Sequence, residues 1–282
     1  MGKISEALEK INKQKTFNEP RMEAFPDEGQ KYLGDELARP VKSVERDLKG
    51  KPPKKFNIDS SMVVFHDPDA IEAELFKSLR TSILFPKDRK PPKTILVTSA
   101  IPGDGKSFVS ANLAMCIANG VEEHVLLVDC DLRKPTIHKI FGINPEIGLS
   151  NFLIEEMDIS EAFVKTPVNK LTLLPVGKLP KKPTELLSSK KMEDLLEELK
   201  KRYDDRYIIL DSPPPSVASE TNAVAKYVDG VILVIKKGKT PRGLINDLIE
   251  MVGKEKIIGI VLNYSEEHLK KYYGYGYGYA HR

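Results

Sequence analysis

Residues 93–120 read KTILVTSAIPGDGKSFVSANLAMCIANG, an apolar run that leads through a glycine-containing turn into a predicted helix. A strand, such a turn and a helix in this order form the setting that a phosphate-binding loop requires. Gly103 and Gly105 let backbone N–H groups turn inward without interference from Cβ atoms, and the positive end of the following helix points to the same place. The segment therefore predicts a P-loop and a nucleotide site.

The side chains of this loop suggest the ligands ATP and Mg²⁺. Lys106 can reach the β- and γ-phosphates, and the Ser107 hydroxyl can ligate Mg²⁺. The strict pattern begins with glycine six residues before the lysine, where this chain has Ala100. The alternative is a glycine-rich turn with a solvated Lys106. The predicted nucleotide-binding residues of this segment are Gly103, Asp104, Gly105, Lys106, Ser107 and Phe108.

Outward from this loop, short runs of Ile, Leu and Val alternate with helical patterns, which indicates a parallel sheet covered on both faces. The runs occupy residues 94–98, 124–128, 171–174, 207–210, 230–235 and 257–262. We predict an α/β fold, a P-loop NTPase three-layer sandwich with a mostly parallel central sheet. The predicted P-loop domain covers residues 61–265. Residues 1–60 form a polar, flexible segment with one amphipathic stretch (Ile4, Ala7, Leu8, Ile11), and residues 266–282 form a tail.

Aspartates follow two further strands at the ends where ligand sites of open α/β sheets lie. VLLVDCDLRKP places Asp129 and Asp131 after one strand, and YIILDSPPP places Asp211 after another. We expect Asp211 to hold Mg²⁺ through water, and Asp129 to be either a general base or a Mg²⁺ ligand. Arg133 either contacts phosphate or pairs with an acidic neighbour. The predicted catalytic set is Lys106, Asp129, Asp131 and Asp211, and the predicted metal set is Ser107, Asp129 and Asp211.

The charge, the cysteine content and the apolar runs of the chain limit its partners and its location in the cell. The net charge of +3 with no basic stripe gives no reason to expect nucleic-acid binding. Two cysteines without metal-ligand spacing fit a reducing compartment. No signal peptide is evident, and the apolar runs are far shorter than the ~20 residues of a membrane span. We expect a cytoplasmic protein that reaches the inner face of the membrane through a partner.

The chain ends in KKYYGYGYGYAHR, in which tyrosine mostly alternates with glycine. Such a segment cannot build a core, so its phenols are either acceptors of a transferred group or a low-complexity contact surface. A phenol has a pKa of about 10, and an acceptor hydroxyl therefore benefits from a nearby base. The candidate acceptors are Tyr272, Tyr273, Tyr275, Tyr277 and Tyr279.

Together these motifs resemble the bacterial tyrosine kinases (BY-kinases) of capsule and exopolysaccharide loci, over roughly residues 65–282. AIPGDGKS is similar to their Walker A motif, VLLVDCDLRKP to their Walker A′ motif, and the tail to their autophosphorylation cluster. The resemblance implies a tyrosine autokinase that phosphorylates the tails of neighbouring subunits in trans and forms a ring that loosens on phosphorylation. It also implies activation by a separate, membrane-embedded polysaccharide chain-length regulator, and polysaccharide-assembly enzymes as substrates.

Two residue assignments come from the same resemblance. A family helix with Glu-x-x-Arg-x-x-Arg helps to form the ring, and ELFKSLR supplies Glu74, Lys77 and Arg80 at these positions. Lysine replaces the first arginine, and the two are not interchangeable in a bidentate contact. The alternative is a solvated helix face. Asn263 in VLNY contacts the adenine in this interpretation, or has a purely structural role at a strand end.

A competing hypothesis is an ATPase switch of the partition or division-site class, which shares the fold. That class carries a signature lysine five residues before the P-loop lysine, where this chain has Ile101. This difference argues against the ATPase switch.

Overall fold

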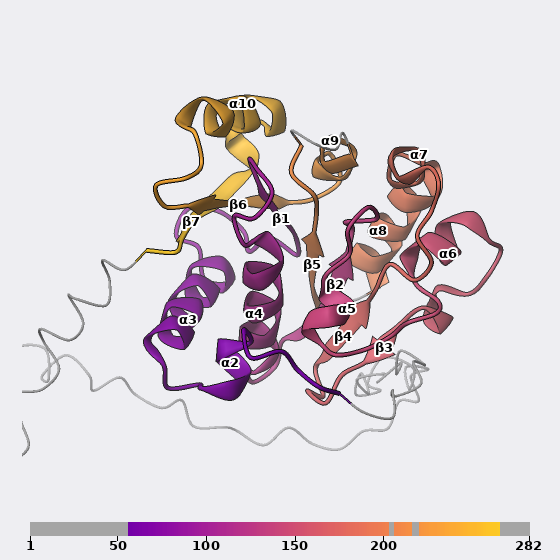
Figure 1. Ribbon diagram of the computed structural model, residues 1–282, viewed down its shortest axis with the longest axis horizontal. Coiled ribbons are helices and arrows are strands. Elements are labelled where there is room, and N and C mark those ends of the chain that lie inside the picture. Colours follow the sequence, from indigo (N-terminus) through magenta and orange to yellow (C-terminus); the bar gives the residue numbers. More distant parts are fainter. Residues whose placement is uncertain (1–55, 203–205, 216–219, 266–282) are drawn as a thin grey trace, which may run out of the picture. The chain divides into compact units, whose positions relative to one another are not determined.

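The computed structural model describes residues 56–202, 206–215 and 220–265, and within them a seven-stranded sheet has the order β3-β4-β2-β5-β1-β6-β7 (Figure 1). Every neighbouring pair is parallel except β3 and β4. This confirms the predicted α/β fold with a mostly parallel sheet. The strands are β1 Thr94–Ser99, β2 His124–Asp129, β3 Val164–Lys165, β4 Leu171–Leu174, β5 Arg206–Asp211, β6 Gly230–Lys236 and β7 Ile257–Asn263.

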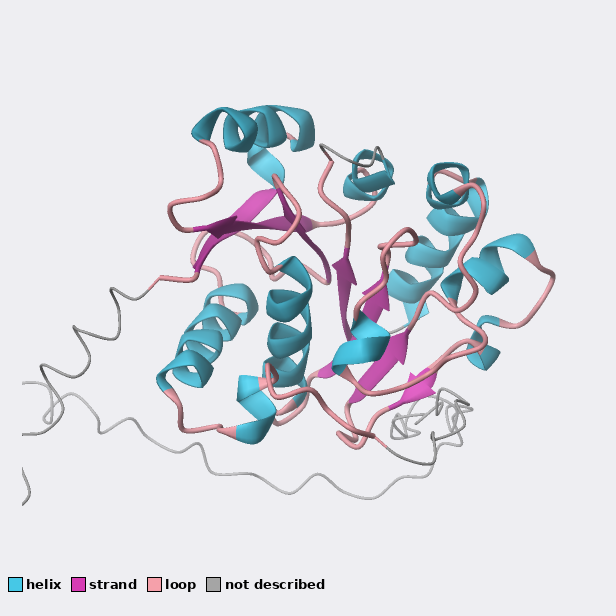
Figure 2. Ribbon diagram, in the orientation of Figure 1, coloured by secondary structure: helices cyan, strands magenta, loops and turns pink. Residues whose placement is uncertain are grey.

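Helices cover both faces of the sheet (Figure 2). One core cluster joins the sheet to α2, α3, α4 and α5, and the other joins it to α6, α7, α8, α9 and α10. The helices are α2 Val63–His66, α3 Ile71–Leu84, α4 Lys106–Ala118, α5 Ile137–Ile140, α6 Leu149–Ile154, α7 Pro183–Leu187, α8 Lys190–Arg202, α9 Glu220–Ala225 and α10 Arg242–Val252, with 3₁₀ turns η1 Ile159–Glu161 and η2 Lys254–Lys256.

The central strands read as continuous apolar runs because both of their faces are covered. All six residues of β1 are buried, and ten consecutive residues of α4, from Val109 to Ala118, are buried between the sheet and the helices α2 and α3. A helix that is apolar all round belongs inside a protein. The predicted N-terminal segment up to residue 55, including Ile4 to Ile11, and the tail tyrosines lie outside the described residues.

The strand order sets the position of the functional site. β1 lies between β5 and β6, and β2 lies on the far side of β5. The chain therefore crosses β5 on its way from β1 to β2, and the carboxyl ends of these three strands meet at one edge. Asp129 of β2 lies opposite Asp211 of β5, and Asp211 lies opposite Val97 of β1. Among the described residues, no helix is long and apolar enough to cross a membrane.

Asp229 immediately precedes β6 and connects it to β1 at the amino ends of these strands, opposite the carboxyl ends that carry the site. Its Oδ2 atom accepts hydrogen bonds from the backbone N–H groups of Lys93 and Thr94 (3.0 and 2.9 Å) and from the Thr94 hydroxyl (2.9 Å). Its Oδ1 atom accepts one from Lys200 Nζ at 2.7 Å. Burial alone would raise the pKa of Asp229, but the hydrogen bonds from Lys200 and Thr94 outweigh it and lower the pKa.

Replacing Asp229 with alanine should destabilise the fold. The fully buried Thr94 would lose the acceptor for its N–H and hydroxyl groups, so we expect Asp229→Ala to lower the free energy of unfolding by about 1–3 kcal/mol. The partly exposed ion pair with Lys200 adds little to this. Urea unfolding at neutral pH measures the change. Asp247→Ala, at an exposed position of α10, is the control, and equal stability of the two variants would contradict this role of Asp229.

Candidate active site

The P-loop connects β1 to α4 and depends on two left-handed glycines. Gly103 has a φ of 85° and Gly105 a φ of 94°, in the region that residues with a Cβ atom rarely occupy. At Gly105 there is a second reason, because a Cβ atom would lie 2.1 Å from Asn263 Nδ2. The sequence pattern predicts that Gly103 and Gly105 need backbone freedom. The packing of Gly105 against Asn263 of β7 is visible only in the tertiary structure.

The structure brings four of the predicted residues together at the sheet edge. Lys106 Nζ lies 3.2 Å from Asp131 Oδ2, in an ion pair whose side chains are 14% and 7% exposed. The Ser107 hydroxyl donates a hydrogen bond to Asp211 Oδ2 at 2.6 Å. These contacts join the P-loop to the ends of β2 and β5, as the prediction of convergent strand ends requires.

Ser110 completes this contact set and was not predicted. Its hydroxyl lies 3.1 Å from Asp211 Oδ1 and 2.9 Å from the Lys106 carbonyl oxygen, so each oxygen of this buried carboxylate has a serine of α4 within hydrogen-bond distance. Ser107 and Ser110 are three residues apart and therefore share a helix face. That spacing was the signal in the sequence that could have identified Ser110.

Asp129 is fully buried, and backbone N–H groups surround its carboxyl group. Oδ1 accepts from Asp131 N at 3.1 Å, while Oδ2 accepts from Thr136 N and Ile137 N, both at 3.1 Å. The carboxyl group thus holds the loop that carries Asp131. Burial, and then the charge of Asp211, raise the pKa of Asp129 to about 8 despite these hydrogen bonds.

The electrostatic balance of the site is set by three aspartates around one lysine. Burial alone would lower the pKa of Lys106, but the charges of Asp211 and Asp131 outweigh it and raise the pKa. Burial raises the pKa of Asp211, although Lys106 and the hydrogen bond from Ser107 oppose the shift. The site thus contains three carboxyl groups and only one lysine to balance them. A cation placed here would lower the pKa of these carboxyl groups.

The donor set fits Mg²⁺. The Ser107 hydroxyl and the Asp211 carboxylate are hard oxygen donors in contact with each other. The described residues contain no group of three His, Cys, Asp or Glu side chains that could hold a metal ion. Mg²⁺ suits such a sparse site, because it keeps several water ligands and takes others from substrate phosphates.

Three other predicted nucleotide-binding residues make contacts within the protein. Asp104 is 1% exposed, and its Oδ1 atom accepts a hydrogen bond from the Thr240 hydroxyl at 2.9 Å. Asn263 Nδ2 donates to the carbonyl oxygen of Asp104, also at 2.9 Å. The Phe108 ring packs edge-on against Phe76 of α3, with 5.7 Å between centroids. Thr240 was not predicted as a site residue, because it lies 136 positions from Asp104 and no local pattern shows that the two meet.

Outside the P-loop, the remaining predicted residues are distributed over two surfaces. Arg133 is exposed and donates to Thr184 Oγ1 of α7 at 3.4 Å. Glu74 and Lys77 form an exposed ion pair of 2.6 Å on α3. Arg80 Nη1 donates to the carbonyl oxygen of Cys116 at 3.1 Å, in the last turn of α4, where a cation is favourable.

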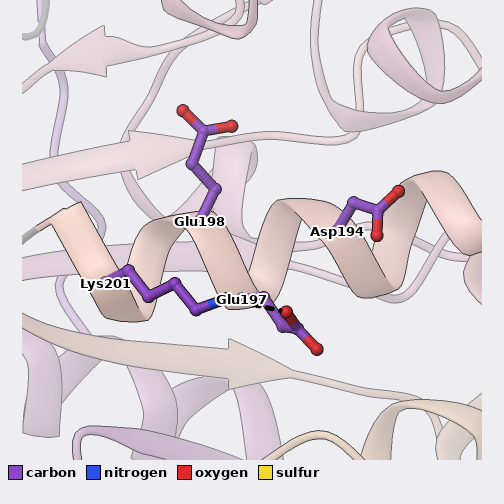
Figure 3. A pocket seen from close by; sticks show the side chains of 4 residues that line it. All are labelled: Asp194, Glu197, Glu198 and Lys201. Carbon is purple, nitrogen blue, oxygen red and sulfur yellow. Dashed lines mark hydrogen bonds and ion pairs between the residues drawn. The ribbon is translucent and has the colours of Figure 1, made fainter.

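A hollow of about 440 Å³ lies on α8 and is lined by Asp194, Glu197, Glu198 and Lys201 (Figure 3). Glu197 and Lys201 pair with each other at 3.0 Å. The C-terminal end of α8 precedes the start of β5, whereas the P-loop and the aspartates lie where the strands end. This charged helix surface is therefore separate from the phosphate site.

The parallel sheet, and the P-loop with aspartates at the carboxyl ends of β2 and β5, define the chain as a P-loop NTPase. Residues 92–257 match the family described as an AAA domain. The chain is 34% identical to the tyrosine-protein kinase YwqD of Bacillus subtilis over 77% of this chain and 90% of that protein. It is 32% identical to the putative tyrosine-protein kinase CapB of Staphylococcus aureus over 80% of this chain and 98% of that protein.

A solved structure agrees. The kinase domain of the Escherichia coli tyrosine kinase ETK superposes with a TM-score of 0.68 at 26% identity, over 81% of this chain and 87% of that chain. This chain belongs to the bacterial tyrosine-protein kinases, a P-loop family whose members use ATP. The expectation of a kinase is confirmed and is favoured over a partition-type ATPase switch.

The raised pKa of Asp129 should appear in the pH dependence of stability. Its folded pKa of about 8 lies above the ordinary value of 3.8, so the folded state binds more protons between these values. The free energy of unfolding therefore falls as the pH rises through this window. Asp129→Asn removes this titration and its repulsion of Asp211, so the decline between about pH 5 and about pH 8 should be shallower in the variant.

Urea unfolding of the metal-free and nucleotide-free protein at several pH values measures this decline. The control is Asp247→Asn, at an exposed position of α10. Its free energy of unfolding should fall with pH as steeply as that of the unaltered protein. If the free energy of unfolding of Asp129→Asn fell with pH as steeply as that of the unaltered protein, the raised pKa would not belong to Asp129.

Proposed function

We propose that this kinase transfers the γ-phosphate of ATP to tyrosines in the tail of a neighbouring subunit. The acceptors are Tyr272, Tyr273, Tyr275, Tyr277 and Tyr279, in a segment that alternates tyrosine with glycine. The observation that carries the proposal is the set of contacts joining Lys106 to Asp131 and Ser107 to Asp211 at the phosphate loop. A phosphoryl-transfer site needs a cation for the phosphates beside oxygen ligands for a metal.

Within this site the side chains have separable roles. Lys106, held by Asp131, would neutralise the β- and γ-phosphates while remaining charged, because Asp211 and Asp131 raise its pKa. Ser107 and Asp211 would hold Mg²⁺, which supplies electrostatic stabilisation of the transferred phosphoryl group. Gly103, Gly105 and Phe108 would contribute backbone N–H groups.

Asp129 is our candidate for the base that accepts the tyrosine proton. Its pKa of about 8 lies near the working pH, where a general base is most effective. Its oxygens also accept three backbone hydrogen bonds, which fix its position. A role as a further Mg²⁺ ligand is the alternative, and in that case the bound cation would lower its pKa.

The exposed residues of α3 extend the proposal to contacts between subunits. Glu74 and Lys77 are exposed on α3 and available to a neighbouring subunit in a ring. Arg80 uses Nη1 for the Cys116 carbonyl oxygen, so its other guanidinium nitrogens would make the contact. Each phosphate adds about −1.5 to −2 charges, and several on adjacent tails would repel one another and weaken a ring.

The cellular role that we propose is regulation of capsule or exopolysaccharide synthesis and export. It rests on the resemblance of the Walker motifs and the tail to the kinases of such loci. An activating, membrane-embedded chain-length regulator and polysaccharide-assembly enzymes as substrates are part of the same proposal.

Labelling with radioactive ATP and Mg²⁺ tests the transfer. Lys106→Met should reduce phosphotyrosine at least about 100-fold, because it removes the cation from the phosphate site. Lys226→Met, an exposed lysine after α9, should label normally. Replacing the five tail tyrosines with phenylalanine should remove most of the label and leave ATP affinity within about twofold, because the site itself is unchanged.

A mixing experiment tests transfer between subunits. The Lys106→Met chain keeps its tyrosines but lacks the loop lysine, and the phenylalanine-tail chain keeps the site but lacks acceptors. Mixing the two should label the Lys106→Met chain. Unlabelled tyrosines in the mixture, together with a labelled tail in the unaltered protein, would show transfer within one subunit instead.

A further inference from the structure

Asp104 occupies the centre of the P-loop, yet two distant segments of the chain hold it. Its Oδ1 atom accepts from the Thr240 hydroxyl, and its carbonyl oxygen accepts from Asn263 Nδ2, each at 2.9 Å. Its Oδ2 atom is buried without a hydrogen-bond partner among the described residues. Burial raises the pKa of Asp104, and the hydrogen bond from Thr240 opposes this shift.

The Thr240 hydroxyl is oriented by its surroundings. It accepts a hydrogen bond from the Lys236 backbone N–H at 2.9 Å, in a tight turn where Thr240 N also donates to Lys236 O at 3.2 Å. With one lone pair of the hydroxyl oxygen engaged by this N–H group, the hydroxyl proton points elsewhere, and of its two acceptors Asp104 Oδ1 lies closer than Lys236 O, at 2.9 against 3.3 Å. The turn after β6 thus presents a fixed donor to the P-loop.

Asn263 is fixed in the same way at the end of β7. Its Oδ1 atom accepts from the backbone N–H of Tyr264 at 2.9 Å, and Tyr264 has a φ of 58°, which a residue with a Cβ atom rarely adopts. Lys236 Nζ lies 3.9 Å from the centroid of the Tyr264 ring. The amide group therefore has its oxygen and its nitrogen committed to the protein, and it packs directly against Gly105.

We infer that Thr240 and Asn263 are positioning residues for phosphoryl transfer that act through Asp104. We call Thr240, Asp104 and Asn263 the Asp104 clamp. It holds the turn between Gly103 and Gly105 from the side of β6 and β7, so the N–H groups of the loop are oriented before the phosphates arrive. The inference rests on the proposed function in that ATP is the ligand of this loop.

The chemistry of the clamp supports positioning over simple stabilisation. A buried carboxylate with one unpaired oxygen lowers the stability of the folded state. Such local conflicts in natural proteins concentrate at functional sites. Preorganised donors avoid reorganisation during the reaction, and small displacements of them reduce the rate steeply.

Thr240→Val and Thr240→Ser form a matched pair for the test. Valine keeps the shape and removes the hydroxyl, so the affinity for Mg-ADP in isothermal titration calorimetry should fall about tenfold. Serine keeps the hydroxyl and should bind within about twofold of the unaltered protein. Asn263→Asp keeps the acceptor for Tyr264 but opposes a carboxylate to the Asp104 carbonyl oxygen, and it should weaken binding at least as much as valine does.

A double-mutant cycle shows whether the effect passes through Asp104. In an Asp104→Ala background, Thr240→Val should change the affinity by less than about twofold. A purely structural role predicts lower stability to urea in Thr240→Val with unchanged Mg-ADP affinity, and that result would overturn the inference. Equal losses in the serine and valine variants would also overturn it.

Tail labelling in the same preparations separates this inference from the proposed function. Normal tail labelling with unaltered Mg-ADP affinity in Thr240→Val and Asn263→Asp rejects the clamp and leaves the kinase proposal in place. Weakened binding in both variants, with no phosphotyrosine on the unaltered protein, supports the clamp and contradicts the proposed acceptors.

Discussion

Three buried aspartates share one lysine at the carboxyl edge of the sheet, and this imbalance of charge organises the site. Lys106 pairs with Asp131, while Asp211 takes its hydrogen bonds from two serines of α4. Burial raises the pKa of both Asp129 and Asp211, and a neighbouring carboxylate adds to each shift, Asp211 for Asp129 and Asp131 for Asp211. A cation with its bound phosphates would offset this repulsion and lower the pKa of these carboxyl groups.

The backbone around this cluster is held from two directions. On the side of β2, Asp129 accepts three N–H groups and shapes the loop that carries Asp131. On the side of β6 and β7, Thr240 and Asn263 hold Asp104. The P-loop therefore lies between two anchored segments, and its glycines give it a conformation that fits both.

Two residues connect the phosphate loop and its helix to α3 and to the end of β7. Arg80 joins α3 to the last turn of α4, the helix that begins at Lys106. Asn263 is the last residue of β7 and precedes the segment that leads to the tyrosine tail. Arg80 thus contacts the helix that follows the phosphate loop, and Asn263 contacts the loop itself.

The sequence alone determined the fold class, the P-loop and the strand-end aspartates, because apolar runs, glycines and their spacing are local properties of the chain. It placed Lys106, Ser107, Asp131 and Asp211 at one site, since parallel strands end at a common edge. Only the tertiary structure decided their partners. The pairing of Lys106 with Asp131, the contacts of Ser110 and Thr240, and the packing of Asn263 on Gly105 depend on the order of the strands. That order places residues between 25 and 159 positions apart in contact, and no local pattern specifies which of them meet.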